Sequence, residues 1–91
     1  MICRLTEIVN PSGLHGRPAA QLVEAAKRYR SKLTIRNITE HGEAVNAKSI
    51  VRILSLSASK GKTVELCAEG EDEIQALEDL INLIDSGFGE I

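Results

Sequence analysis

Apolar and polar residues alternate with two different periods along the chain, and each change of period marks an expected element. After residue 18, apolar residues recur every three or four positions, with Leu22, Val23 and Ala26 on one face. This spacing predicts a helix that begins near residues 16–18 and ends near Arg30. A proline at its start is compatible, because the first N–H groups of a helix have no intrahelical partner.

Other segments carry the two-residue period that is typical of strands. Residues 32–38 and residues 63–69 alternate apolar with polar side chains, so each predicts a strand. Residues 2–9 carry apolar or β-branched residues on both faces, which indicates a strand without a defined register. Between these elements, Gly42 is the expected pivot of a turn, and a short strand over residues 43–47 would complete a hairpin.

Two more helices are expected in the second half of the chain. Ile50, Ile53 and Leu54 lie at helical spacing behind Ser49, which is a natural N-cap. The last helix should span residues 71–86, with acidic residues at the positive end of its dipole. Its expected apolar face comprises Ile74, Leu77, Leu80, Ile81 and Ile84.

The resulting order, β-α-β-β-α-β-α, predicts an α+β fold. Each helix has one apolar face and therefore needs a sheet to cover. The simplest arrangement places the helices on one face of a four-stranded, mostly antiparallel sheet. A length of 91 residues suits a single domain, so residues 1–91 are expected to form one unit.

Composition and charge exclude several classes of function. The net charge of −2 disfavours nucleic-acid binding, and two aromatic residues, Tyr29 and Phe88, offer no surface for base stacking. The sequence contains neither a signal peptide nor a membrane-spanning segment, which predicts a cytoplasmic protein. Cys3 and Cys67 lack the spacing of a zinc site, and we expect free thiols in a reducing compartment rather than a disulfide.

The stretch "GLHGRPAA" places chemically active groups where a helix is about to start. A neutral imidazole at His15 can act as a nucleophile, and attack on phosphorus would give a labile N–P bond. The helix start offers unpaired N–H groups to the new negative charge, and Arg17 offers charge-assisted hydrogen bonds. Gly13 and Gly16 allow the backbone to bend around a bulky group. These residues together suit a transient phosphate carrier.

The same residues have a plainer interpretation. A lone histidine before a helix is often only a solvated side chain, and Arg17 would then be a surface charge. A metal site is not expected, because His15 and His41 are the only histidines and no carboxylate motif accompanies them. No nucleotide-binding or serine-hydrolase motif is present, and no cofactor is predicted.

Three segments resemble the HPr family, the small phosphocarriers of the bacterial phosphoenolpyruvate-dependent phosphotransferase system. "GLHGRPAA" is similar to the family's phosphorylation signature, "AKSI" to the signature around its regulatory serine, and "AEGEDE" to its junction before the last helix. The resemblance implies an open-faced sandwich with strand order 1-4-2-3. It further implies that His15 is phosphorylated on Nδ1 by enzyme I, that Arg17 assists the phosphoryl group, and that an enzyme IIA protein is the acceptor.

The resemblance also implies a partner-docking surface around this histidine. It further implies that the protein is a monomer, and that it acts as a carrier rather than as an enzyme. Ser49 matches the regulatory serine, the target of an HPr kinase/phosphorylase in some members. Ile50 and Val51 are adjacent in a short helix, so we expect one of them on the surface, unless an irregular helix buries both. The expected docking residues are Leu14, Gly16, Ala20, Lys27, Lys48, Ile50, Val51, Arg52 and Leu54.

Departures from the family pattern indicate a branch. Gly16 replaces a common threonine or alanine, which predicts a looser first turn, and Glu24 replaces a lysine that is common in sugar-pathway carriers. The ending "INLIDSGFGE" resembles the nitrogen-regulatory branch, whose donor would be a nitrogen-type enzyme I. Three alternatives stay open: a carrier for sugar uptake, a regulatory protein that acts through Ser49 without relay, and a small-ligand sensor.

Overall fold

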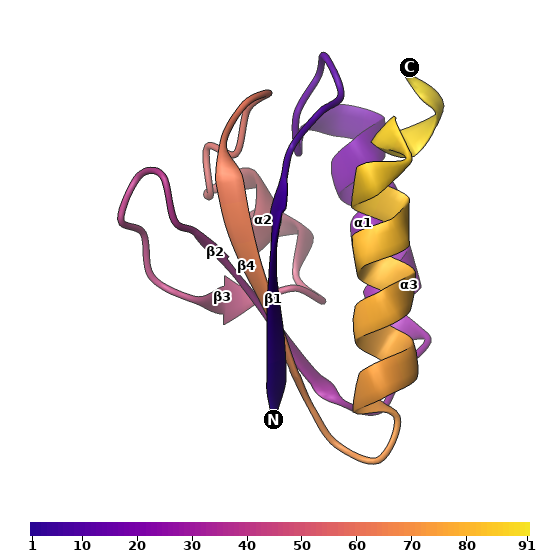
Figure 1. Cartoon of the computed structure of the whole chain (residues 1–91). Helices are drawn as coiled ribbons and strands as arrows, with labels where there is room; N and C mark the ends of the chain where they lie inside the picture. Colours follow the sequence, from indigo (N-terminus) through magenta and orange to yellow (C-terminus); the bar gives the residue numbers. More distant parts are fainter.

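The computed structural model describes all residues, 1–91, and contains the seven expected elements followed by one 3-10 turn. Figure 1 shows them as two layers, a twisted sheet and a layer of helices. No helix is long and apolar enough to cross a membrane. In chain order the elements are β1 (Ile2–Glu7), α1 (Gly16–Lys27), β2 (Lys32–Asn37), β3 (Val45–Asn46), α2 (Ile50–Leu54), β4 (Thr63–Glu69), α3 (Glu73–Asp85) and η1 (Gly87–Gly89).

The four strands form one sheet in the order β1-β4-β2-β3, with antiparallel pairing throughout. This confirms the expected α+β class and strand order. The register, which the sequence left undefined for β1, places Thr6 opposite Val64 and Arg4 opposite Leu66. Val64 and Leu66 are fully buried, so the even-numbered residues of β1 face the helices. The odd-numbered residues, including the exposed Leu5, lie on the open face.

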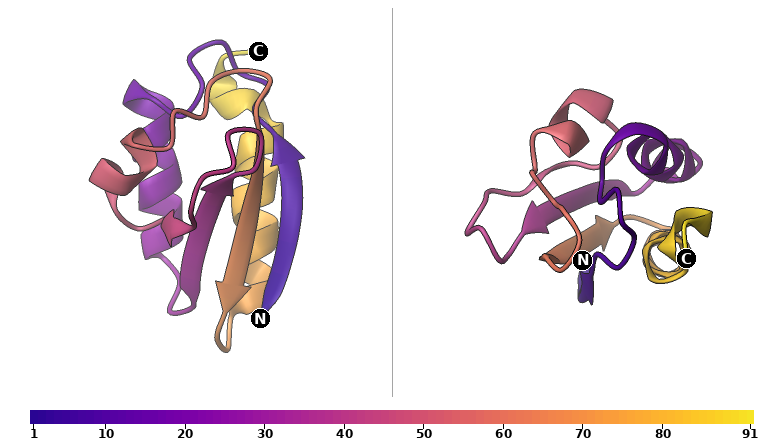
Figure 2. Two further views of the ribbon diagram at one scale, coloured as in Figure 1. Left: turned by 90° about the vertical axis from the view of Figure 1, so that its left-hand side faces the viewer. Right: turned by 90° about the horizontal axis from the view of Figure 1, so that it is seen from above.

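The three helices cover one face of the sheet, as the views from the side and from above show (Figure 2). Their apolar residues form one core with the inward-facing residues of β2 and β4. Leu22 of α1, Ile53 of α2 and Leu80 of α3 are fully buried in it. The apolar stripes that predict the helices therefore point where amphipathic helices should, toward the sheet.

Some boundaries differ from the expected ones. The first helix ends at Lys27 rather than near Arg30, because the N–H groups of Arg28 and Tyr29 bond to carbonyls three residues back and tighten the last turn. The hairpin turn has its left-handed residue at His41, with φ of 56°, and not at Gly42 as expected. The third strand is shorter than expected, with two residues in the ladder.

Ile74 does not belong to the buried face of α3, contrary to the expectation from its spacing. The side chain is 64% exposed, whereas Ala76, Leu77 and Leu80 are buried. Ile74 lies in the first turn and at the border of the stripe that these residues define, so the sheet does not reach it.

The expectation of two free thiols is wrong, because Cys3 and Cys67 form a disulfide. The two residues are 64 positions apart in the chain, yet the antiparallel register places them directly opposite each other on β1 and β4. Their Cα atoms lie 4.0 Å apart, which is close even for opposed residues on neighbouring strands. Sequence spacing carries no record of this register, which is why cysteine counting failed here.

Candidate functional site

His15 occupies the N-cap position of α1, with an extended backbone (φ −132°, ψ 159°). The residue is exposed, and its side chain makes no capping hydrogen bond to the helix. A histidine at an N-cap can bond back to the first turn, but His15 makes no such bond. Both ring nitrogens are therefore open to an incoming group from solvent.

Gly16, the residue between His15 and Arg17, has a left-handed backbone with φ of +55°. A β-carbon built at this position would meet no atom within 4 Å, so space does not require a glycine. The requirement comes from the backbone, because the left-handed conformation costs an L-residue with a side chain roughly 1–2 kcal/mol. The glycine thus fits a specific bend at the helix start rather than a generally loose first turn.

Arg17 lies in the first turn of α1 and is exposed, so its guanidinium can reach a group held at the helix start. The N–H groups of this turn have no intrahelical acceptor, and they contribute partial positive charge. On its other side, Arg17 lines a shallow groove of about 410 Å³ between α1 and α3, together with Glu24, Arg28 and Asp79. Glu24 therefore places negative charge on the same groove as Arg17.

The loop before His15 is fastened to the segment that follows α2. The N–H of Leu14 donates to the carbonyl of Ala58 at 2.9 Å, and the Leu14 side chain is fully buried. Gly13 has φ of +67°, and a β-carbon there would lie 2.7 Å from the Ala58 carbonyl oxygen. The prediction that Leu14 is a docking residue is therefore wrong, because its fully buried side chain anchors the loop to the core and offers no surface to a partner.

A second fastening of the same loop comes from the C-terminus and was missed by the sequence analysis. The Glu90 carboxylate accepts hydrogen bonds from the Asn10 side-chain amide at 3.0 Å, from the Ser12 N–H at 3.0 Å and from the Ser12 hydroxyl at 2.8 Å. These bonds, with that of Asn10 first, hold the pKa of the Glu90 carboxyl below its usual value. We call Asn10, Ser12 and Glu90 the loop clamp.

The clamp depends on how the chain turns after α3. Gly87 and Phe88 both have a left-handed backbone, and the Phe88 ring is buried. This turn brings Glu90 back over residues that lie 78 and 80 positions earlier in the sequence. The only sequence signal was the pair of glycines around a lone phenylalanine, which marks a turn but does not identify its target.

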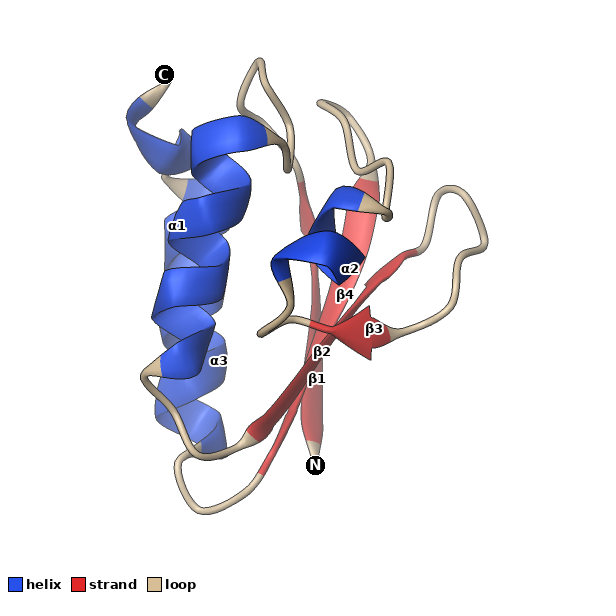
Figure 3. Cartoon of the chain, turned by 180° about the vertical axis from the view of Figure 1, so that it is seen from behind, coloured by secondary structure: helices blue, strands red, loops and turns tan.

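Three apolar residues of α2 are exposed, and we call them the α2 patch. Ile50, Val51 and Leu54 are 39%, 71% and 43% exposed, whereas Ile53 is fully buried. We expected one of Ile50 and Val51 on the surface, and both are exposed, as is Leu54. A helix of five residues has room for one inward-facing side chain here. Figure 3 shows α2 packed beside α1 on the same side of the sheet.

Polar residues flank the α2 patch. The Ser49 hydroxyl accepts a hydrogen bond from the Arg52 N–H at 3.3 Å, which confirms the expected N-cap. The Lys48 ammonium donates to the Tyr29 carbonyl at 2.7 Å and so ties α2 to the end of α1. Lys27 and Arg52, like Ala20 and Gly16, are exposed. The expected docking residues other than Leu14 thus lie wholly or partly on the surface.

The arrangement combines an accessible nucleophile, a helix start and an arginine with an exposed apolar patch. The first three groups can accept and stabilise a phosphoryl group. The patch is the kind of surface that marks a protein–protein contact, since contiguous exposed apolar residues are uncommon on the surface of a monomeric protein. The candidate reactive residues and the exposed apolar patch thus lie on two adjacent helices.

Comparisons with known proteins match nearly the whole chain. Residues 2–86 match the family described as the PTS HPr component phosphorylation site. The phosphocarrier protein HPr of Haemophilus influenzae is 40% identical over 92% of this chain and 95% of its own length. The multiphosphoryl transfer protein of the same organism is 45% identical over 91% of this chain, which spans only 17% of that larger protein.

A solved structure supports the fold over the whole chain. The crystal structure of HPr-C-His from Thermoanaerobacter tengcongensis covers 100% of this chain and 99% of its own, with a TM-score of 0.94 and 44% identity.

Proposed function

Since the chain belongs to the HPr family, the phosphocarriers of the phosphotransferase system, we propose that His15 is its phosphoryl acceptor. A protein of this family is a carrier and not an enzyme. In the relay, enzyme I donates a phosphoryl group derived from phosphoenolpyruvate, and an enzyme IIA protein receives it. The observation that carries the proposal is the accessible His15 ring, free of any cap bond, at the start of α1.

The proposed step is an attack by Nδ1 of the neutral imidazole on the phosphorus of the donor. A bond from nitrogen to phosphorus forms as the bond from the donor to phosphorus breaks, and the electron pair leaves with the donor. The transferred group brings negative charge to the start of α1, where the helix dipole and the Arg17 guanidinium stabilise it. A water-exposed location keeps this stabilisation modest, which suits a carrier that must release the group again.

A variant pair tests this assignment. The protein is incubated with phosphoenolpyruvate and enzyme I, and its mass is measured at neutral and at acid pH. His15→Ala should give no adduct and keep its fold, because the exposed ring makes no core contact. Arg17→Ala should be phosphorylated, but about a hundredfold more slowly, the lower end for the loss of one preorganised charge. An acid-stable adduct, or one that persists in His15→Ala, would refute the proposal.

The α2 patch, with Lys48 and Arg52 beside it in the chain, is the proposed docking surface for both donor and acceptor. Three exposed apolar side chains supply area, and the basic residues favour partners with acidic contact surfaces. Lys48 contributes through its bond to the Tyr29 carbonyl, which fixes α2 against α1. We place this relay in the cytoplasm, with a monomeric carrier.

Within the family, we assign the chain to the nitrogen-related relay rather than to sugar uptake. Glu24 is exposed on the groove that Arg17 also lines, and its charge is opposite to that of the lysine common in sugar-pathway carriers. A donor that expects positive charge there should dock less well. The C-terminal segment, which resembles the nitrogen branch, supplies the loop clamp through Glu90.

Initial rates with the two types of enzyme I decide the branch. The nitrogen-type enzyme should phosphorylate the protein faster, and Glu24→Lys should raise the rate with the sugar-type enzyme. Glu71→Lys is a matched control, because Glu71 is an exposed glutamate just before the start of α3 and does not line the groove of Arg17 and Glu24. Equal rates with both donors would remove the assignment to the nitrogen-related relay. An equal gain from Glu24→Lys and Glu71→Lys would show that the effect does not depend on the position of Glu24.

A second candidate function is regulation through Ser49. Its hydroxyl caps α2 directly beside the α2 patch, so a phosphate there would add about −1.5 to −2 charges to the docking surface. Phosphorylation by an HPr kinase/phosphorylase would then reduce docking without unfolding the protein. Incubation with such a kinase and ATP, followed by mapping of the acid-stable phosphate, tests it; a product without phosphate on Ser49 would rule it out.

A further inference from the structure

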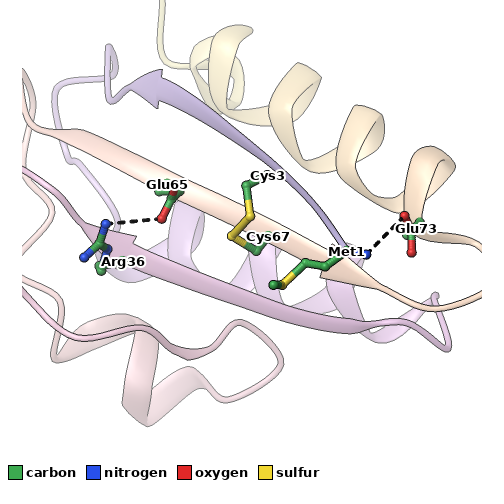
Figure 4. Close-up of a disulfide and its surroundings, with 6 residues drawn as sticks. All are labelled: Met1, Cys3, Arg36, Glu65, Cys67 and Glu73. Carbon is green, nitrogen blue, oxygen red and sulfur yellow. Dashed lines mark hydrogen bonds and ion pairs between the residues drawn. A yellow bond between two sulfur atoms is a disulfide. The ribbon is translucent and has the colours of Figure 1, made fainter.

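The open face of the sheet carries a pair of sulfur atoms for which the relay has no use. Cys3 on β1 and Cys67 on β4 are directly opposed and point away from the helices, as Figure 4 shows. Cys3 is exposed and Cys67 is half-buried, so solvent reaches the disulfide between them. The backbone positions belong to a continuous antiparallel ladder, which holds both residues in register whether or not the sulfur–sulfur bond is present.

A third donor stands on the same face. Glu65 precedes Cys67 by two residues on β4, so its carboxylate projects on the same side of the sheet. A carboxylate oxygen of Glu65 and the two sulfur atoms all lie within 4.8 Å of one another. Two sulfurs and one carboxylate oxygen at this spacing form a set of ligands that zinc accepts, with bonds of about 2.0–2.3 Å.

We propose that Cys3, Cys67 and Glu65 bind one Zn²⁺ ion when the disulfide is reduced. A dithiol reductant supplies two electrons and two protons, which convert the disulfide to two thiols. With a phosphine, the phosphine supplies the two electrons, and water supplies the two protons and the oxygen of the phosphine oxide. Binding of Zn²⁺ then releases those two protons, because the metal takes both sulfurs as thiolates. Glu65 supplies the third bond and water the fourth, so the ion completes the four-coordinate shell that zinc prefers.

The geometry of the pair suits chelation. Zinc with two thiolate bonds of about 2.3 Å in a tetrahedral shell holds its sulfurs roughly 3.8 Å apart, farther than a disulfide does. Rotation about the Cα–Cβ bonds of Cys3 and Cys67 provides this separation without moving the strands. Oxidation and metal binding exclude each other, since the same two sulfurs cannot be bonded to one another and serve as two thiolates.

One neighbour opposes the site and provides a sharp test. A guanidinium nitrogen of Arg36 lies 3.4 Å from a Glu65 carboxylate oxygen, in an ion pair with both side chains partly exposed. For Glu65 to bind the metal, this pair must loosen, and the cation of Arg36 also repels Zn²⁺. Removal of the Arg36 charge should therefore strengthen metal binding, whereas an unrelated surface site would be indifferent to it.

The site lies away from the phosphoryl chemistry. Cys3 is near the free end of β1, whereas the loop to His15 leaves the other end of the strand (Figure 1). A hollow of about 280 Å³, lined by Met1, Lys32 and Thr34 among others, opens beside Cys67 and gives water and ions access. The proposal therefore does not depend on the proposed relay, and the two can fail separately.

The test is a zinc titration of the full chain against a chromophoric chelator. The protein reduced with a phosphine should bind one Zn²⁺ per chain, and the oxidised protein should bind none. Cys3→Ser and Cys67→Ser should each weaken binding by more than about tenfold, which is the scale for loss of even an outer partner of a metal ligand. Glu65→Gln should weaken it as well, and Arg36→Ala should tighten it.

Controls separate this site from adventitious binding and from misfolding. His41→Gln removes an exposed histidine, a side chain that readily binds stray zinc, and should leave the affinity unchanged. Far-ultraviolet circular dichroism shows whether each cysteine variant is folded, and zinc should raise the melting temperature of the reduced wild type but not of Cys3→Ser. Zinc binding by the oxidised protein, or an affinity that Cys3→Ser or Glu65→Gln leaves unchanged, would overturn the proposal.

Discussion

The helices α1 and α2 lie side by side, yet they use their apolar residues in opposite ways. In α1, Leu22 and Val23 are buried against the sheet and α3. In α2, Ile53 alone is buried, and Ile50, Val51 and Leu54 face solvent. Twelve residues give α1 a full apolar stripe, while five residues give α2 little more than one turn.

The difference teaches that apolar residues at helical spacing do not all serve the core. Burial of the α1 stripe stabilises the fold through the area it removes from water. The apolar residues of α2 remain in water and gain nothing until a partner covers them. A short helix that is held by one buried side chain, a cap and a lysine bond can thus present an apolar surface at little cost to stability.

The largest effect on stability should come from a cavity in the core beneath α1. Leu22→Ala should lower the free energy of unfolding by about 2–5 kcal/mol, because the fully buried side chain leaves a cavity. Val51→Ala, the matched change in α2, should alter it by no more than about 0.5 kcal/mol. Urea unfolding of both variants measures the contrast, and equal losses would show that the α2 patch is part of the core.

When the rate of phosphoryl transfer is measured instead of stability, a charge on the α2 patch should have a larger effect than the substitution in the core. Val51→Asp keeps the fold, since the side chain is 71% exposed, but it places a charge at the centre of the proposed docking surface. We expect the rate of phosphorylation by enzyme I to fall by at least about tenfold, as for loss of an interface hot spot. Leu22→Ala, assayed below its melting temperature, should keep its rate. An unchanged rate in Val51→Asp would remove the patch from docking.

A smaller effect is expected at the cap of α2. Ser49→Ala should lose about 0.5–1 kcal/mol of stability, because the Arg52 N–H loses its acceptor. Ser49→Asp can still cap the helix, so it should keep the melting temperature and instead slow phosphorylation of His15. Thermal melts and initial rates on the two variants separate the effects. If Ser49→Asp unfolds the protein, or transfers phosphate at the normal rate, the link between this serine and docking is wrong.

The loop clamp should contribute a modest, pH-dependent part of the stability. The folded-state pKa of Glu90 is lowered, so its contribution is present above the unfolded-state pKa and is lost as pH falls through the folded-state value. Glu90→Gln should therefore lower the melting temperature at neutral pH and reduce its decline in acid. Asp72, whose pKa the Ser31 hydroxyl lowers, will keep a similar decline in both proteins.

Thermal melts from neutral to acid pH provide the measurement. Glu71→Gln is the control, because Glu71 is exposed and accepts no hydrogen bond. An equal pH profile for wild type and Glu90→Gln would mean that the bonds to Asn10 and Ser12 do not hold the loop.

Patterns among residues that are close in sequence predicted the helices and strands well. They predicted less well which residues are buried and where turns are centred. The periodicity around Leu22 and the cap at Ser49 depend on neighbours in sequence, and both are confirmed. Burial of Ile74 was predicted wrongly, because spacing identifies a stripe but does not show whether anything covers it. The pivot at His41 was missed since glycine is the usual left-handed residue, although its neighbour holds that conformation here.

The pairs that are distant in sequence could not be predicted at all. The disulfide between Cys3 and Cys67 depends on the register of β1, which its mixed pattern left undefined. The bonds of Glu90 to the loop depend on a turn after α3 whose direction is set by the burial of Phe88. In the candidate site, His15 and Arg17 were identified from one motif, whereas the residues that fasten their loop come from the far end of the chain.

The central claim is that His15 carries the phosphoryl group on Nδ1, and heteronuclear magnetic resonance tests it most directly. The protein is labelled with ¹⁵N in its histidines and phosphorylated by enzyme I and phosphoenolpyruvate. We expect a single new phosphorus signal, coupled to Nδ1 of His15, and no change at His41. A phosphorus signal coupled to Nε2 or to His41, or one with no coupling to any histidine nitrogen, would contradict the account.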